Sequence, residues 1–229
     1  MDTALEKLSI PPSDLLGLLA TPAHPTGLVI FVHDSESGLV HERNQQVAAA
    51  LREQGIATLL FDLLTPVEAR DRQKVFDIAL LASRLEDAVR WATHDERTQG
   101  LPLGLYGSGS GAAAVLTAAS RAHINAAAIV CSGGRVDLAA PALPQVTAPT
   151  LLVVGADDTP VLDLNRQARS LLQAPSELLT VRGASHRFEE AGAMDEVVQL
   201  TTEWFARHLG AVGQPGGAQA GRAASRPAA

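Results

Sequence analysis

Short apolar runs that alternate with longer helical patterns constrain the fold of this chain more than any other feature. Most of these runs lack the polar alternation of a half-exposed strand, as expected where helices cover both faces of a parallel sheet. The candidate strands of this kind lie at 28–32, 58–61, 103–106, 127–131, 151–154 and 178–181. They predict a sheet whose strands are joined by helical crossovers.

Helical patterns fill the intervals between these runs. The helices expected from them span about 41–54, 73–94, 110–122, 162–173 and 189–208. Two further apolar runs, at 5–10 and 15–20, flank Pro11-Pro12 and are typical of an antiparallel hairpin. The whole pattern predicts an α/β fold with an eight-stranded, mostly parallel, doubly wound sheet flanked by helices.

The length and composition suit one α/β domain, which we expect over residues 1–210. The last segment, 211–229, consists of Gly, Ala, Pro and Gln with few other residues, two of them arginines. It has almost nothing to bury, so we predict a disordered tail there. Only about 18 residues separate the runs at 127–131 and 151–154, which leaves no room for a lid domain and favours a small ligand.

The charge balance argues against a nucleic-acid partner, because 25 acidic side chains face 18 basic ones and phosphate binding needs clustered Lys and Arg. No apolar run approaches membrane-spanning length, and the N-terminus lacks the pattern of a signal peptide. The single cysteine, Cys131, excludes an intramolecular disulfide. We therefore expect a cytoplasmic protein, with Cys131 as a structural residue in a buried strand.

Residues that carry chemistry follow the predicted strand ends, where ligands bind in doubly wound sheets. These segments are His33-Asp34, Asp62, the turn Gly107-Ser108-Gly109-Ser110-Gly111, Asp157-Asp158 and Ser185-His186. The turn lies between a strand and a helix, as a nucleophile elbow does. The chain order of turn, acid and histidine is the order found in α/β-hydrolases.

The sequence resembles the dienelactone-hydrolase-like branch of the α/β-hydrolases, which includes phosphoribosyltransferase-associated hydrolases. The resemblance covers about 5–209. It rests on the following segments: Phe61-Asp62-Leu63-Leu64-Thr65, Gly111-Ala112-Ala113-Ala114, Gly133-Gly134-Arg135 with Asp137-Leu138-Ala139, Val154-Gly155 with Pro160-Val161-Leu162, and Gly183-Ala184-Ser185-His186 with Phe188-Glu189-Glu190. It implies a hydrolase acting on a small ester or lactone without a metal or organic cofactor.

The resemblance also implies roles for two residues. His186 matches the general base, and Asp158 matches the acid that orients it, with Asp157 as the neighbouring alternative. An exposed loop histidine and a helix-entry aspartate are the alternative interpretations. The histidines His33, His41 and His186 do not have the spacing of a metal site.

The nucleophile does not carry over, because the central position of the turn is Gly109. Glycine suits the strained backbone of such a turn and supplies no hydroxyl. Ser110 is the alternative nucleophile, and Ser108 is a weaker one. The glycine is compatible with a loss of acyl-transfer chemistry and also with an engineered inactivation.

The oxyanion region differs from the family as well. The resemblance places His33, Asp34 and Ser110 there, and a family glycine is replaced by Asp34, whose charge opposes a developing oxyanion. Asp62 and Arg135 are candidates for substrate binding, although Arg135 could instead pair with Asp137.

Two hypotheses about function follow from these residues. The first is a hydrolase of small esters or lactones. The second is a catalytically impaired relative that binds a small molecule or a protein partner in the same cleft.

Overall fold

The computed structural model describes residues 4–33 and 41–210 of the chain. Asp34 and the segment 211–229, which we predicted to be a disordered tail, lie outside the described residues.

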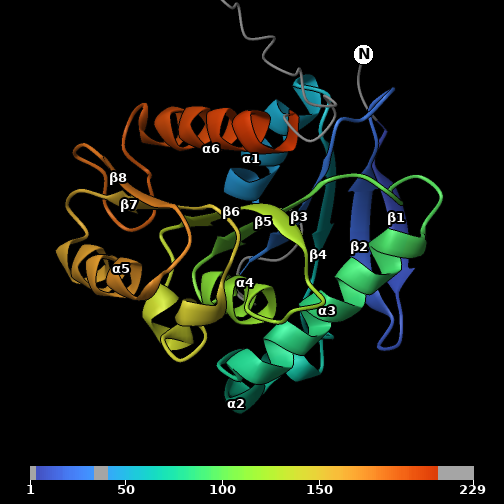
Figure 1. The fold of residues 1–229 in the computed structure, drawn as a ribbon, viewed down its shortest axis with the longest axis horizontal. Coiled ribbons are helices and arrows are strands. Elements are labelled where there is room, and N and C mark those ends of the chain that lie inside the picture. Colours follow the sequence, from blue (N-terminus) through green and yellow to red (C-terminus); the bar gives the residue numbers. More distant parts are fainter. Residues whose placement is uncertain (1–3, 34–40, 211–229) are drawn as a thin grey trace, which may run out of the picture.

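The described residues form the predicted sheet, with eight strands in the order β1-β2-β4-β3-β5-β6-β7-β8 (Figure 1). Strand β2 pairs antiparallel with both β1 and β4, and β3 to β8 pair in parallel. The bounds are β1 Glu6–Ile10, β2 Leu15–Ala20, β3 Leu28–Val32, β4 Ala57–Phe61, β5 Leu103–Ser108, β6 Ala126–Ser132, β7 Thr150–Gly155 and β8 Ser176–Val181. The fold class expected from the apolar runs is confirmed.

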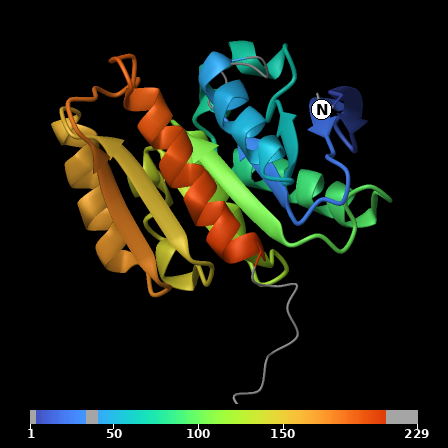
Figure 2. The same cartoon turned by 90° about the horizontal axis from the view of Figure 1, so that it is seen from above.

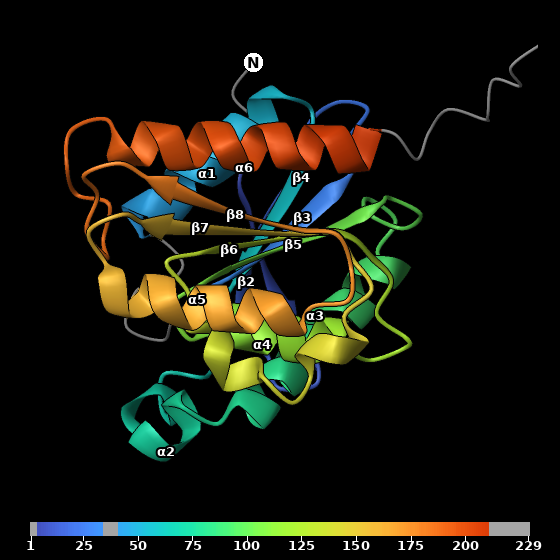
Figure 3. The same ribbon diagram turned by 60° about the vertical axis from the view of Figure 1, so that its left-hand side comes forward.

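Helices cover both faces of the sheet, as Figures 2 and 3 show. One face carries α1 (Glu42–Glu53) and α6 (Ala193–Leu209), and the other carries α3 (Ile78–His94), α4 (Gly111–Ala119) and α5 (Thr159–Leu171). Two short 3₁₀ turns, Val136–Ala139 and Leu143–Gln145, occupy the connection between β6 and β7, so no lid domain is inserted there.

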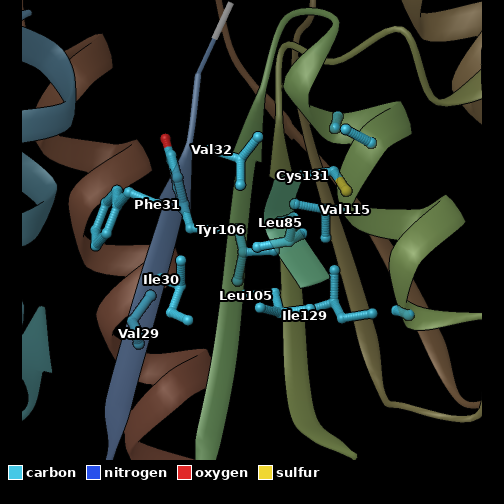
Figure 4. Close-up of a cluster of buried hydrophobic side chains, with 14 of the residues drawn as sticks. Val29, Ile30, Phe31, Val32, Leu85, Leu105, Tyr106, Val115, Ile129 and Cys131 are labelled. Carbon is cyan, nitrogen blue, oxygen red and sulfur yellow. The ribbon is translucent and has the colours of Figure 1, made fainter. Parts of the chain in front are cut away.

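The core lies on both sides of the central strands (Figure 4). Along β5 the residues alternate between the two faces. A Cβ at Gly104 would meet the ring of Phe205 in α6 at 2.7 Å, whereas one at Gly107 would meet the Cα atom of Ala112 in α4 at 2.7 Å. Tyr106 therefore points to the α1/α6 side, where its ring centroid lies 4.8 Å from that of Phe31.

The prediction of a single helix over 73–94 is wrong for its first residues. The chain forms a one-turn helix α2 (Arg72–Val75), breaks, and starts α3 at Ile78. Asp77 causes the restart, because its carboxylate accepts a hydrogen bond from the backbone N–H of Leu80 at 3.0 Å and so caps the new helix.

Helix α4 ends at Ala119, before the predicted 122, and two other helices begin at other residues than predicted. Helix α5 begins at Thr159, earlier than 162, with Pro160 in its first turn, where a missing N–H is tolerated. Helix α6 begins at Ala193, later than 189, because Gly192 before it has a left-handed φ of 78°.

A partly buried carboxylate, Glu68, holds the segment after β4. It accepts hydrogen bonds from the backbone N–H and the hydroxyl of Thr65, both at 3.1 Å, and it pairs with Lys74 and Arg84. The Thr65 N–H is the largest cause of a lowered pKa, which falls to about 2 although burial opposes the shift. The ionised Glu68 thus ties the segment to α3.

This pKa predicts acid sensitivity. Because the folded pKa is below the ordinary value, the stabilisation is complete above about pH 4.5 and is lost as the pH falls toward 2. We expect Glu68→Gln to lower the free energy of unfolding by about 1–2 kcal/mol at pH 7. Urea unfolding between pH 3 and 7 tests this, with the exposed Glu53→Gln as control; an equal effect at every pH would contradict it.

Packing at Gly104 gives a second prediction. Phe205 is fully buried over this glycine, so Phe205→Ala should cost about 3–5 kcal/mol in free energy of unfolding. Phe76→Ala is the matched control, because Phe76 is 58% exposed, and it should change stability by less than about 0.5 kcal/mol. Similar losses for the two variants in urea titrations would refute this account of the core.

Candidate active site

The turn after β5 is fixed by close backbone approaches at its two outer glycines. A Cβ at Gly107 would lie 2.7 Å from the Cα atom of Ala112, and a Cβ at Gly111 would lie 2.7 Å from the carbonyl oxygen of Val32 in β3. No larger residue fits at either position without moving the backbone. These contacts set the register of the turn and place Gly109 at its centre.

Gly109 has a left-handed φ of 55°, a conformation that L-amino acids rarely adopt and that a nucleophile elbow imposes on its central residue. Its carbonyl oxygen accepts a hydrogen bond from the Arg135 N–H at 3.0 Å, which ties the turn to the segment after β6. The turn therefore contains the strained backbone position of a nucleophile elbow, but the residue at this position has no side chain.

The two serines flank this position in different environments. Ser108 is the last residue of β5 and lines a small cavity on the α1/α6 side. Ser110 precedes α4 with a helical backbone, is 9% exposed, and makes no side-chain capping bond. Neither serine occupies the position with positive φ.

His186 and Asp158 come together across two strand ends, 28 residues apart in the sequence. The His186 Nδ1 atom lies 2.7 Å from the Asp158 Oδ2 atom. The histidine side chain is 53% exposed and the aspartate side chain is 11% exposed. A largely covered carboxylate thus holds the Nδ1 atom of an imidazole that is otherwise half exposed to solvent, an arrangement typical of a general base and its orienting acid.

The geometry distinguishes Asp158 from its neighbour. Asp158 is the residue before α5, yet its side chain makes no capping bond and turns to His186 instead. Asp157 is exposed, and its backbone N–H donates to the Ala184 carbonyl oxygen at 3.0 Å. The side chain of Asp158 therefore does not cap α5, as the helix-entry interpretation would require.

The loop that carries His186 is supported by residues that the sequence analysis did not single out for this role. A Cβ at Gly155 would lie 2.3 Å from the Ala184 carbonyl oxygen and 2.4 Å from that of Ser185. From the other side, the Arg43 Nη1 atom donates to the Arg187 carbonyl oxygen at 3.0 Å. Phe188 is buried at a left-handed φ of 53°. The sequence shows a glycine at the end of a predicted strand, Gly155. It gives no sign that Arg43 in α1 would bond to this loop.

His33 and Asp62 form a second histidine–carboxylate contact at the ends of β3 and β4. The His33 Nε2 atom lies 3.2 Å from the Asp62 Oδ1 atom, and the histidine is buried. The His33 Nδ1 atom is buried without a hydrogen-bond partner among the described residues. Asp62, predicted for substrate binding, thus contacts the neighbouring candidate of the oxyanion region.

Arg135 makes the intramolecular pair that the sequence left open. Its Nε and Nη2 atoms donate to the two carboxylate oxygens of Asp137, both at 2.8 Å. This hydrogen bonding raises the pKa of Arg135 and lowers that of Asp137. The guanidinium fork is already occupied, although the side chain remains partly exposed at the site.

A reactive Cys131 thiol and a metal site are two further kinds of chemistry that the sequence analysis considered. Burial raises the pKa of the Cys131 thiol, so the thiolate is disfavoured. Within residues 4–33 and 41–210, no group of three or more His, Cys, Asp or Glu side chains could hold a metal ion. In the same part of the chain, no helix is long and apolar enough to cross a membrane.

An eight-stranded sheet with a strand–turn–helix elbow and a His–Asp pair at its carboxyl edge defines the α/β-hydrolase class. Within this class, the chain belongs to the dienelactone hydrolase family, whose model matches residues 15–209. The relationship expected from the sequence motifs is confirmed.

The similar proteins agree with this assignment. The chain is 44% identical to a dienelactone hydrolase of known structure from Anabaena variabilis, with a TM-score of 0.85, covering 90% of this chain and 98% of that one. Est1E from Butyrivibrio proteoclasticus shares the fold alone, at 14% identity and a TM-score of 0.76, covering 90% of this chain and 99% of Est1E.

Two curated proteins from strains of Mycobacterium tuberculosis, each named "Putative phosphoribosyl transferase", are 46% identical over 205 residues. The match covers 90% of this chain, but the chain spans only 46% of their length.

The support of the His186 loop generates a prediction. Gly155→Ala places a methyl group against two carbonyl oxygens of the loop, so we expect it to displace His186 and to cost about 1–3 kcal/mol in stability. Gly210→Ala is the control, because nothing lies within 4 Å of its added Cβ. Urea unfolding and the histidine ring signals in NMR report the two effects; an unmoved His186 signal in Gly155→Ala would contradict the proposed support.

Proposed function

We propose that this chain keeps the ligand cleft of its family and binds a small ester, lactone or related carbonyl compound, while serine-dependent acyl transfer is impaired. One observation carries the proposal: Gly109 stands at the strained centre of the turn with φ 55°, in a register that Gly107 and Gly111 fix by backbone contact. A shift of Ser108 or Ser110 into that position would break both contacts.

The proposed roles follow the chemistry of the family. His186 is the general base, able to accept a proton through the nitrogen that Asp158 does not hold. Asp158 orients the ring and stabilises its cation. The backbone N–H of Ser110, at the start of α4, is the proposed donor to a carbonyl oxygen. Without a hydroxyl at position 109, His186 has no serine proton to take, and no acyl-enzyme forms there.

The expected consequence is slow turnover. Loss of one member of such a triad typically lowers the rate by about 10⁴–10⁶-fold, because the members act as a unit. What remains is binding, together with any water that His186 activates. The family resemblance assigns Asp34, which lies outside the described residues, to the oxyanion region, where a negative charge opposes a developing oxyanion.

The phosphoribosyl transferase name of the longer relatives is not assigned to this chain. The segment shared with them spans about half of their length, and the dienelactone hydrolase family accounts for it.

Turnover of p-nitrophenyl acetate and butyrate tests the proposal. We expect wild type to be nearly inert and Gly109→Ser to gain at least about 100-fold, since the introduced hydroxyl enters a position built for a nucleophile. His186→Ala in that background should remove the gain. A Gly109→Ser/Asp34→Gly double variant covers the case in which Asp34 alone blocks the reaction.

The matched control is Gly109→Ala, which adds the same backbone strain without a hydroxyl and should stay inert. An active wild type that Ser110→Ala or Ser108→Ala inactivates would overturn the proposal. It would establish the hydrolase hypothesis with a displaced nucleophile.

A further inference from the structure

Asn165, in the second turn of α5, is a fully buried amide that faces two carbonyl oxygens. Its Nδ2 atom donates to the Gly134 oxygen at 3.0 Å and to the Val161 oxygen at 2.9 Å. Because carbonyl oxygens only accept hydrogen bonds, the nitrogen of the amide must face them. The Asn165 Oδ1 atom is buried and has no partner among the described residues.

This arrangement has a free-energy cost, since a buried acceptor without a hydrogen bond loses its water without compensation. The Val161 oxygen lies four residues earlier in the same helix, where the backbone N–H of Asn165 is its regular partner. The bond to the Gly134 oxygen is therefore the one that an apolar residue at position 165 would leave unmade.

The Gly134 oxygen belongs to a peptide unit that contacts the nucleophile turn. The N–H of the same unit, that of Arg135, donates to the Gly109 oxygen at 3.0 Å. In a planar trans peptide the C=O and the N–H point in opposite directions, so this unit links Asn165 on one side to the turn on the other. A Cβ at Gly134 would lie 2.3 Å from the Cβ atom of Ala112, which shows how closely the unit packs against α4.

The same geometry applies one peptide unit further, at the centre of the turn. The Gly109 C=O and the Ser110 N–H belong to one unit, so an oxygen held by Arg135 directs the N–H away from that contact. No backbone acceptor for the Ser110 N–H is found among the described residues. This N–H is the proposed donor to a ligand carbonyl oxygen, and its direction therefore depends on the bond from Arg135.

We propose that Asn165 is a positioning residue that aims and strengthens the Ser110 N–H through Gly134, Arg135 and Gly109. Each hydrogen bond polarises the next, because a peptide whose oxygen accepts a bond becomes a better donor at its N–H. The inference rests on the proposed function, in which the Ser110 N–H binds a carbonyl oxygen, and it adds to the site a residue that contacts no ligand.

Helix α5 thereby supports both parts of the site. Asp158 precedes its first residue and holds His186, and Asn165 lies about two helical turns further along and holds the nucleophile turn. The acid of the His–Asp pair and the support of the oxyanion donor are thus parts of one rigid element.

The first experiment measures the hydrogen bond and needs no activity. The NMR coupling across the bond, between the Arg135 nitrogen and the Gly109 carbonyl carbon, reports the strength of that bond. We expect Asn165→Leu in the full chain to lower this coupling and to move the amide signal of Ser110, because the Arg135 N–H becomes a weaker donor.

Thr98→Val is the matched control. Thr98 is also buried, and its hydroxyl donates to a carbonyl oxygen, that of Ala92, at 2.7 Å. It precedes β5, at the opposite edge of the sheet from the turn, so its loss should leave the coupling and the Ser110 signal unchanged. If Asn165→Leu fails to fold, Asn165→Met is the second variant, because an unbranched side chain adapts to the available space.

The second experiment measures the consequence for catalysis in the Gly109→Ser background. Adding Asn165→Leu should lower kcat for p-nitrophenyl butyrate by at least about tenfold and change KM by less than about twofold, because the oxyanion contact strengthens in the transition state. Rates are expressed per active enzyme, titrated with a fluorophosphonate. Adding Thr98→Val instead should preserve kcat.

The coupling decides the role of Asn165 whatever the activity: an unchanged value in a folded Asn165→Leu or Asn165→Met chain would overturn the proposal. A kcat that Asn165→Leu leaves unchanged, or that Thr98→Val lowers equally, would overturn it as well. If Gly109→Ser stays inert while Asn165→Leu lowers the coupling, the proposed function fails and the positioning of the Ser110 N–H is retained.

Discussion

The close backbone approach between β5, β3 and the start of α4 is the constraint on which the site depends. Gly107 lets the chain turn back against Ala112, and Gly111 lets α4 begin against the Val32 carbonyl oxygen. Because neither contact tolerates a Cβ, the turn cannot slide by a residue, and the left-handed centre must fall on Gly109. The scaffold of a nucleophile elbow is thus preserved by packing, independently of whether a nucleophile is present.

Close backbone packing also positions His186, the proposed general base. Gly155 allows the loop of His186 to lie against the end of β7, while Arg43 and the left-handed Phe188 hold the loop from the α1/α6 side. Asp158 then meets the imidazole at 2.7 Å rather than capping its own helix. This His–Asp pair, together with the glycine at position 109, is the basis of the proposal that the protein binds carbonyl compounds but does not transform them efficiently.

The strands and the site edge could be predicted from sequence because each strand is a short apolar run followed by a polar or glycine residue. Asp158, His186 and Gly109 follow from their places after such runs. The break before α3 could not be predicted, since the helical periodicity continues across Asp77, whose capping bond appears only in three dimensions. The contact between His33 and Asp62 could not be predicted either, because it joins the ends of two strands that are distant in sequence.

The central claim is that no serine of the turn is an activated nucleophile. Treatment of the wild-type protein with a fluorophosphonate, followed by intact-mass and peptide mass spectrometry, tests it most directly, because phosphonylation requires a serine activated by a base. With Gly109→Ser as the positive control, the account predicts no adduct on the wild-type chain. A stoichiometric, His186-dependent adduct on Ser108 or Ser110 would contradict it.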